Sequence, residues 1–428
     1  MLELCGTLWS YWCSLAWYLV LGRPFETCPY FRDPRSRQAR VQTYSLALNL
    51  LLWDQPHYRH KTYAHDLRAN LRNVAVPGTG VPLSIFCYHK VGGYLLVFLL
   101  NPLVCFLGAV NVARKDCQAP WSWSVLSNAF RQHLLFPDDW FSYWRLNCVL
   151  ASWYELATAA PGYALENKWL FLQKCMQLGV PCSPVMDIRG ICVKHKNEEG
   201  GLGIHFYQSA SAGGDWIIQQ TLQNASNIQT LLPVGAPLST FRVMTGSRAG
   251  LSLAETDGGN PSPTADPDEV FAFSCVFRAG RANSATDHNS VLFDVDVKNK
   301  RFGQGTSNMH WYQLGPTKVF TTSWLNNSKF THHPDGNIPV TGRVLPDIDS
   351  MIQTCVDAHK TLFPDVPIAG WDLCVVQGEP RLCLLEANLM CNFFKGTFDK
   401  DKYFSFAEDY FHAVETRRKN LAAATKSE

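Results

Sequence analysis

The chain has 428 residues, which is more than one ordinary hydrophobic core holds and enough for two or three domains. Charged residues make up only 17% of it and the formal net charge is +2, so the composition lacks the basic excess that a nucleic-acid partner would require. The 15 cysteines show no CxxC pair and no short Cys/His cluster, which argues against a zinc site and a disulfide framework and favours reduced thiols in a reducing compartment.

Two uncharged, apolar runs mark an N-terminal region of residues 1–127. They cover residues 5–22 and 91–112, and the second has about the ~20 residues that cross a bilayer. Both runs fit either buried core helices or a membrane-associated segment, and composition leaves the two alternatives open. Basic residues follow the first run instead of preceding it, unlike in a secretory signal. We therefore expect a cytoplasmic chain, or one on the cytosolic face of a membrane.

A proline interrupts the second apolar run. Pro102 follows Asn101 near the middle of the run, where its ring and its missing N–H would kink or break a helix. If the runs meet a membrane, we therefore expect a re-entrant or interface-lying hairpin in place of two clean spans.

The rest of the chain changes character after residue 127. Residues 128–166 are rich in aromatic side chains and helical in pattern, which predicts a helical connector. From 167 to 400, strand-like runs alternate with glycine turns and a few helices, interrupted by a Pro/Gly/Asp-rich loop at 254–268. Residues 401–428 have the pattern of an amphipathic helix with a polar tail. Together these patterns predict an α+β fold behind an apolar, mostly helical N-terminal region.

The most specific chemistry lies in residues 366–388, where two strand-like runs flank a turn. Side chains alternate along a strand, so Glu386 and Asn388 share one face. With a three-residue loop, Asp372 pairs with Glu386 on that same face, whereas a two- or four-residue loop would place them on opposite faces. Two carboxylates and an amide oxygen are suitable ligands for Mg2+ that also binds a triphosphate. The alternative interpretation of these residues is a solvated strand face on which the acids have no functional role.

Three upstream segments offer groups for an anionic ligand. A short strand ends at Lys194 and leads into a glycine-rich turn at 200–203, where backbone N–H groups can approach phosphates. Residues 216–222 have the pattern of an apolar strand that turns polar and can meet an adenine edge. In the apolar run 238–245, Arg242 is the only charged residue, and a buried arginine needs an anionic partner such as phosphate. Ordinary hairpins and core strands explain each segment taken alone.

The order of these pieces, from about residue 167 to 394, resembles the sugar-transfer-associated ATP-grasp family, an ATP-grasp domain related to alpha-L-glutamate ligases. Each matching motif is short, and their order along more than half of the chain carries the resemblance. The motifs are Asn167-Lys168, Val193-Lys194, Ile218-Gln219-Gln220, Thr240-Phe241-Arg242-Val243, Arg278-Ala279-Gly280, Gly370-Trp371-Asp372 and Leu385-Glu386-Ala387-Asn388.

The resemblance implies a two-lobed ATP-grasp domain, with a small lobe at 167–215 and a large lobe at 216–400. The chain departs from the family pattern at four places, one of which is Asn289-Ser290-Val291 where the family has Gly-Gly. Asn167 replaces an acid, His195 replaces the proline after the strand lysine, and His288 replaces an asparagine. These departures affect the phosphate loop and the acceptor side more than the metal ligands.

The resemblance also implies a role for each matched residue. Arg242 would stabilise the transferring phosphoryl group, and Lys194 would act beside it as the second catalytic cation. Mg2+ would bind Asp372, Glu386 and Asn388. The residues that would hold ATP are Lys168, Lys194, Gly200, Gly201, Gly203, Gln219, Gln220 and Leu222.

The implied activity is that of an ADP-forming carboxylate–amine ligase. Such an enzyme uses ATP and Mg2+ to convert a carboxylate into an acyl-phosphate, which an amine or similar nucleophile then attacks. Its partners would be a small-molecule carboxylate and an amine. Two alternatives stay open: an ATP-grasp phosphotransferase, and a non-catalytic, membrane-associated ATP-binding protein. His288, His332 and His333 are candidates for the acceptor site, and ordinary loop histidines are the alternative.

Overall fold

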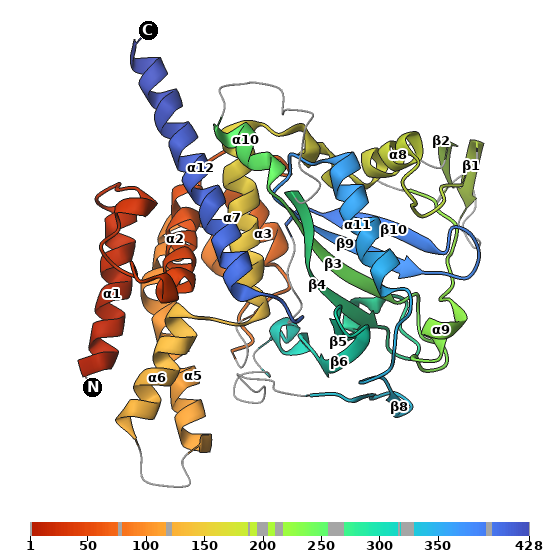
Figure 1. Cartoon of the computed structure of the whole chain (residues 1–428), viewed down its shortest axis with the longest axis horizontal. Helices are drawn as coiled ribbons and strands as arrows, with labels where there is room; N and C mark the ends of the chain where they lie inside the picture. Colours follow the sequence, from red (N-terminus) through yellow and green to blue (C-terminus); the bar gives the residue numbers. More distant parts are fainter. Residues whose placement is uncertain are drawn as a thin grey trace.

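The computed structural model describes residues 2–75, 79–116, 122–186, 189–194, 204–209, 217–255, 269–315, 317, 329–390 and 396–427. A mostly helical N-terminal region lies beside an antiparallel sheet, and helices α7 (Trp140–Thr158) and α12 (Lys400–Ser427) lie between the two (Figure 1). The predicted α+β class, with helices first and the sheet after them, is confirmed.

The N-terminal region is built from short helices around an aromatic core. Phe25, Tyr44 and Trp153 pack with Phe411 of α12, so the two ends of the chain share this core. The elements are α1 (Leu2–Leu19), η1 (Phe25–Thr27), η2 (Pro34–Ser36), α2 (Arg37–Leu51), α3 (Tyr63–Asn70), η3 (Leu83–Cys87), α4 (Lys90–Leu95), the π-helical turn η4 (Leu96–Leu100), α5 (Asn101–Asp116) and α6 (Trp123–Leu135).

The second apolar run forms one continuous helix, residues 90–116, so the expectation that Pro102 would break it is wrong. The π-helical turn η4 ends directly before Asn101-Pro102 and widens the helix there. Proline cannot donate to the carbonyl of Phe98, and Trp12 Nε1 donates to it instead over 3.0 Å. Tyr11 Oη donates to the preceding carbonyl over 2.7 Å. Side chains of the first apolar run thus satisfy carbonyls of the second.

The main sheet has six antiparallel strands in the order β10-β9-β3-β4-β5-β6. Its strands are β3 (Thr240–Ser247), β4 (Val270–Ala279), β5 (Val291–Asp296), β6 (Arg301–Thr306), β9 (Ile368–Val375) and β10 (Leu382–Asn388). Two hairpins stand apart from it: β1 (Arg189–Lys194) with β2 (Ile204–Ser209), and β7 (His332–His333) with β8 (Ile338–Pro339). The other helices are η5 (Pro161–Glu166), α8 (Lys168–Leu178), α9 (Ser226–Gln229), α10 (Ala249–Glu255), η7 (Asp287–Asn289), η8 (Met309–Tyr312) and α11 (Ile348–Leu362).

The two faces of the main sheet differ in character. Phe241 of β3 and Trp371 of β9 are fully buried in the hydrophobic core, and Trp371 stacks on Phe363 at the end of α11 with ring centroids 5.2 Å apart. Because side chains alternate along a strand, the neighbours Arg242 and Asp372 point to the opposite face. Helix packing on one face therefore fixes where the charged side chains of the other face lie.

Candidate functional site

Asp372 and Glu386 pair across β9 and β10 as expected, but the turn differs from the predicted one. The strands stay paired to Val376 and Arg381, whose backbone N and O are 2.8 Å apart, so residues 377–380 form a loop of four residues and not three. Such a loop alone would put the two carboxylates on opposite faces. The register shifts by one residue just before Glu386, and this β-bulge returns Glu386 to the face of Asp372.

The bulge also changes the direction of Leu385. We expected Leu385 and Ala387 to enter the core together. Ala387 does so, but Leu385 packs, partly buried, against a smaller cluster around Cys374 and Cys383. Leu385 and Glu386 therefore lie on the same side of the sheet although they are consecutive, as an extra residue in a bulge requires.

Four charged side chains form a row of ion pairs on this face. Arg242 Nε lies 2.6 Å from Asp372 Oδ1, and Arg278 Nη1 lies 3.1 Å from Asp372 Oδ2. Arg278 Nη2 then lies 3.0 Å from Asp287 Oδ1. All four side chains are at least 86% buried, so cations and anions alternate where unpaired charge would be costly.

The arginines determine the protonation of the central carboxylate. Burial acts to raise the pKa of Asp372, but the charges of Arg242 and Arg278 outweigh burial and hold that pKa below its ordinary value. At Asp287, burial outweighs the charge of Arg278 and the pKa is raised. Asp372 is therefore the stronger acid of the two and stays anionic over the wider pH range.

Glu386 completes the predicted metal cluster. Its Oε2 lies 2.7 Å from Nζ of Lys168, and Asn388 Nδ2 donates to its Oε1 over 3.2 Å. Among the described residues no three His, Cys, Asp or Glu side chains are grouped to hold a metal, so the cluster depends on the amide of Asn388 as its third ligand. Asp372, Glu386 and Asn388 lie close together, and this set of hard oxygen atoms fits Mg2+.

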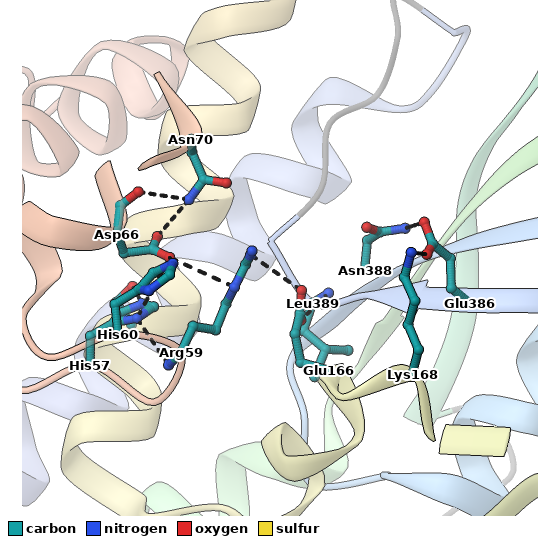
Figure 2. A network of polar contacts seen from close by, with 11 residues as sticks. His57, Arg59, His60, Asp66, Asn70, Glu166, Lys168, Glu386, Asn388 and Leu389 are labelled. Carbon is teal, nitrogen blue, oxygen red and sulfur yellow. Dashed lines mark hydrogen bonds and ion pairs between the residues drawn. The ribbon is translucent and has the colours of Figure 1, made fainter. Parts of the chain in front are cut away.

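A second polar cluster continues from this face into the N-terminal region (Figure 2). Glu166 accepts a hydrogen bond from the backbone N–H of Leu389 over 2.9 Å, and its Oε1 lies 3.3 Å from Arg59 Nη1. Arg59 Nε in turn lies 3.7 Å from Asp66 Oδ1. Because Leu389 directly follows Asn388, a continuous row of polar groups joins the metal cluster to the helical region.

Burial shifts the protonation equilibria of this second cluster. It raises the pKa of Asp66 to about 6 and raises that of Glu166, in both cases against the opposing charge of Arg59. It lowers the pKa of His57 to about 4, so the imidazole is neutral at physiological pH. Such shifts occur at functional sites and in structural ion-pair networks alike.

The predicted adenine-binding residues lie in an extended segment, and the described residues 217–222 form one isolated bridge in place of the expected strand. Gln219 bridges to Val185, and its Nε2 donates to the carbonyl of Ser183 over 3.2 Å. Gln220 follows it, and Leu222 packs against the small cluster beside the β9–β10 hairpin. A cavity of about 900 Å³ adjoins Leu222, which is the one residue lining it among the predicted ATP-binding residues that the structure describes.

The remaining predicted residues fall into three groups. Lys194 is the last residue of β1 and pairs with Ile204. His333 is buried, with Nε2 at 3.1 Å from the carbonyl of Gly280 and Nδ1 accepting from the N–H of Asp335, which favours the structural alternative for this histidine. His332 is exposed. Outside the described residues lie Gly200, Gly201 and Gly203, together with the side chain of His288.

Sequence reasoning assigned no role to three charged neighbours of the site, Arg278, Asp287 and Glu166, although Arg278 belongs to one of the matched motifs. Arg278 follows an apolar run just as Arg242 interrupts one, so the same criterion would have identified it. Glu166 and Asp287 carry no such signal, since their contacts come from distant segments. Comparison of the chain with models of protein families, with curated proteins and with solved structures finds no match in any of the three.

Proposed function

We propose that the chain is an ATP-dependent ligase that activates a carboxylate as an acyl-phosphate and joins it to an amine or similar nucleophile, releasing ADP and phosphate. The observation that carries this proposal is the convergence of Asp372, Glu386 and Asn388 on one sheet face, with Arg242 beside them. The resemblance to the ATP-grasp family supports it and places the nucleotide between the β1–β2 hairpin and the main sheet.

Within this proposal, Asp372, Glu386 and Asn388 would hold Mg2+, which offsets the negative charge of a bound triphosphate. Three cations face these carboxylates, Arg242, Arg278 and Lys168, and they are the groups that can reach phosphate oxygens. Lys168 is 65% exposed and reaches Glu386 from the solvent side, so its ammonium is free to swing between carboxylate and phosphate. Lys194 and the glycine-rich turn after it would contact the phosphates from the hairpin.

The chemistry asked of these residues is mainly electrostatic. The substrate carboxylate attacks the γ-phosphoryl group in line, the bond to ADP breaks, and negative charge spreads over the transferring oxygens. Arg242 is held in a fixed direction by Asp372, so it can stabilise that charge without reorganising. The amine then attacks the acyl carbon and phosphate leaves. The second polar cluster, around Glu166, is the nearest set of buried groups for positioning the amine.

The reaction products test this proposal directly. Purified protein is incubated with ATP, Mg2+ and panels of carboxylic acids and amines, and ADP, AMP and phosphorylated products are separated by chromatography. The ligase proposal expects ADP and phosphate that depend on both acid and amine and are lost in Glu386→Gln. AMP release would contradict it. A stable phosphorylated product formed without an amine would favour the phosphotransferase alternative.

We also propose that the helix of residues 90–116 lies on the cytosolic face of a membrane. Within the described part of the chain, one helix, Lys90–Arg114, is long and apolar enough to cross a bilayer, and only 22% of its apolar window is buried in the protein. Its exposed residues Leu95, Leu99 and Leu103 recur every four positions along one face. Co-sedimentation with vesicles of phosphatidylcholine and phosphatidylserine should fall in Leu95→Glu/Leu99→Glu, and equal binding of the variant would rule this surface out.

A further inference from the structure

A second cavity, of about 300 Å³, lies in the helical region and away from the charged sheet face. Elements α2, α3, η3, the 90–116 helix and α7 surround it. Its volume is at the lower end of the range of about 300–1,000 Å³ that is usual for small-molecule sites. The walls are almost entirely apolar, and the side chains that form them include Leu46, Leu50, Leu71, Val97, Val104 and Trp144.

Besides Thr79, whose Oγ1 accepts from the backbone N–H of Val81 over 3.2 Å, three polar side chains interrupt these apolar walls, and two of them are satisfied within the protein. Asn49 donates to the carbonyl of Ser45 and accepts from Tyr63 Oη. Asn101 donates to Tyr11 Oη over 3.2 Å. The third is Arg145 of α7, the only charged residue among those that line the cavity. The two asparagines are therefore part of the helix packing, and Arg145 needs a separate explanation.

Arg145 is a buried cation that forms no ion pair with any described residue, and the charge of Asp139 offsets its burial only in part. It is 8% exposed, and its one hydrogen-bond partner in the described part of the chain is Gln42, with Nη2 2.6 Å from Oε1. Two adjacent buried donors, Arg145 Nε and Gln42 Nε2, find no acceptor among the described residues. Burial lowers the pKa of Arg145, which reflects the free-energy cost of keeping this charge away from water.

We propose that this cavity binds a single-chain amphiphile, with its aliphatic chain between the helices and its anionic head group on Arg145 and Gln42. A carboxylate or phosphate head would accept from both unsatisfied donors and neutralise the guanidinium. The apolar walls suit a flexible aliphatic chain better than a polar metabolite. The proposal does not depend on the proposed ligase activity.

The position of the cavity agrees with such a ligand. Residues Leu96, Val97, Leu100 and Val104 of the 90–116 helix line the cavity, whereas Leu95, Leu99 and Leu103 are exposed on its other side. One helix therefore separates the cavity from the apolar surface that we assign to the membrane. Membrane lipids and free fatty acids supply the same head-group and chain chemistry, and the choice of probes separates a carboxylate from a phosphate head.

Titration calorimetry on the full chain, without ATP and without detergent, tests the proposal with dodecanoate, dodecyl phosphate and dodecanol below their micelle concentrations. We expect at least one anion to bind about tenfold or more tightly than the alcohol, because a hydrogen-bonded charge pair adds to the same chain contacts. Octanoate and decanoate should bind progressively more weakly than dodecanoate, by up to about fourfold per CH2 group removed. Equal affinity for the alcohol and both anions, or no binding at all, would overturn the proposal.

Matched variants locate the binding site. Arg145→Gln should reduce the affinity for the anion to that for the alcohol, whereas Arg145→Lys should keep part of the preference. Val104→Phe should fill the cavity and weaken all three ligands without touching the head-group donors. Unchanged anion binding in a folded Arg145→Gln protein, checked by circular dichroism, would overturn the assignment. If that variant does not fold, unchanged binding in Val104→Phe would overturn it instead.

Discussion

Two arginines of this molecule are buried to nearly the same degree but in different surroundings. Arg242 on the sheet is 6% exposed and pairs with Asp372, which also pairs with Arg278. Arg145 on α7 is 8% exposed, and among the described residues its one hydrogen-bond partner is the neutral amide of Gln42, with no ion pair. In the first environment each buried charge has an oppositely charged partner within the protein, so no ligand is needed to balance it. Only the types of the side chains there indicate a function. The second is incomplete, and its missing anion is itself the indication of a ligand.

Removing the paired arginine should give the largest effect on stability. Arg242→Met leaves Asp372 buried with Arg278 as its remaining strong partner, and we expect the free energy of unfolding to fall by about 3 kcal/mol. Urea denaturation measures this change. Arg248→Met, which removes a partly exposed pair with Asp409, serves as the control and should change stability by less than about 1 kcal/mol. Equal losses of stability in the two variants would show that burial does not make the ion pair of Arg242 more important than a partly exposed pair.

The polar cluster between the two regions should make stability depend on pH. The pKa of Asp66 is raised from 3.8 to about 6, so between these pH values the folded protein keeps a proton that the unfolded chain releases. The free energy of unfolding therefore falls as pH rises through this range. Relative to wild type, Asp66→Asn should gain up to about 3 kcal/mol between pH 4 and pH 7.

Denaturant unfolding of both proteins at a series of pH values gives this difference. Asp54→Asn, at an acid that is 75% exposed, is the matched control. A difference between Asp66→Asn and wild type that is independent of pH would contradict the raised pKa of Asp66.

Removing Arg145 should not lower the free energy of unfolding as removing Arg242 does. Arg145→Met loses a hydrogen bond to Gln42 but also relieves the desolvation of an uncompensated charge. We expect the ligand-free protein to keep its stability or gain about 1 kcal/mol. Thermal and urea unfolding measure the change. A loss comparable to that of Arg242→Met would mean that Arg145 is a structural residue.

The smallest effect on stability is expected at Lys168, whose side chain is 65% exposed where it pairs with Glu386. Lys168→Ala should change the free energy of unfolding by less than about 0.5 kcal/mol, because such surface pairs are weak. If Lys168 contacts phosphates, the same variant should bind ATP severalfold more weakly in calorimetry. Lys300→Ala removes another exposed pair, with Asp349, and should leave ATP binding unchanged. Equal ATP affinity in both variants would remove Lys168 from the nucleotide site.

Local patterns of the sequence predicted the order of the elements and the pairing of Asp372 with Glu386. The pairing was reached through a wrong loop length, which the β-bulge before Glu386 corrects. Periodicity cannot detect a bulge, since one extra residue leaves the composition of the strand unchanged. The predicted helix break at Pro102 was wrong for a related reason. Trp12, which is distant in sequence, donates to the carbonyl that the proline cannot bond.

The parts of the site that could not be predicted from the sequence depend on contacts between distant segments. Glu166 meets Leu389 and Arg59, and the cavity beside Arg145 is enclosed by side chains from elements as far apart in sequence as α2 and η8. No single window of the sequence contains these neighbours. Lone charges in apolar runs, such as Arg242 and Arg278, are the exception, because the need for a partner is visible before the partner is known.

Calorimetric titration of ATP, with and without Mg2+, tests the central claim most directly. We compare wild type with the Asp372→Asn/Glu386→Gln double variant, after circular dichroism has shown that both are folded. The proposed ligase should bind ATP in wild type with an affinity that Mg2+ increases, and the variant should lose that Mg2+ dependence. A folded wild-type protein that binds no ATP, or a double variant with the same Mg2+ dependence as wild type, would contradict the assignment of this sheet face.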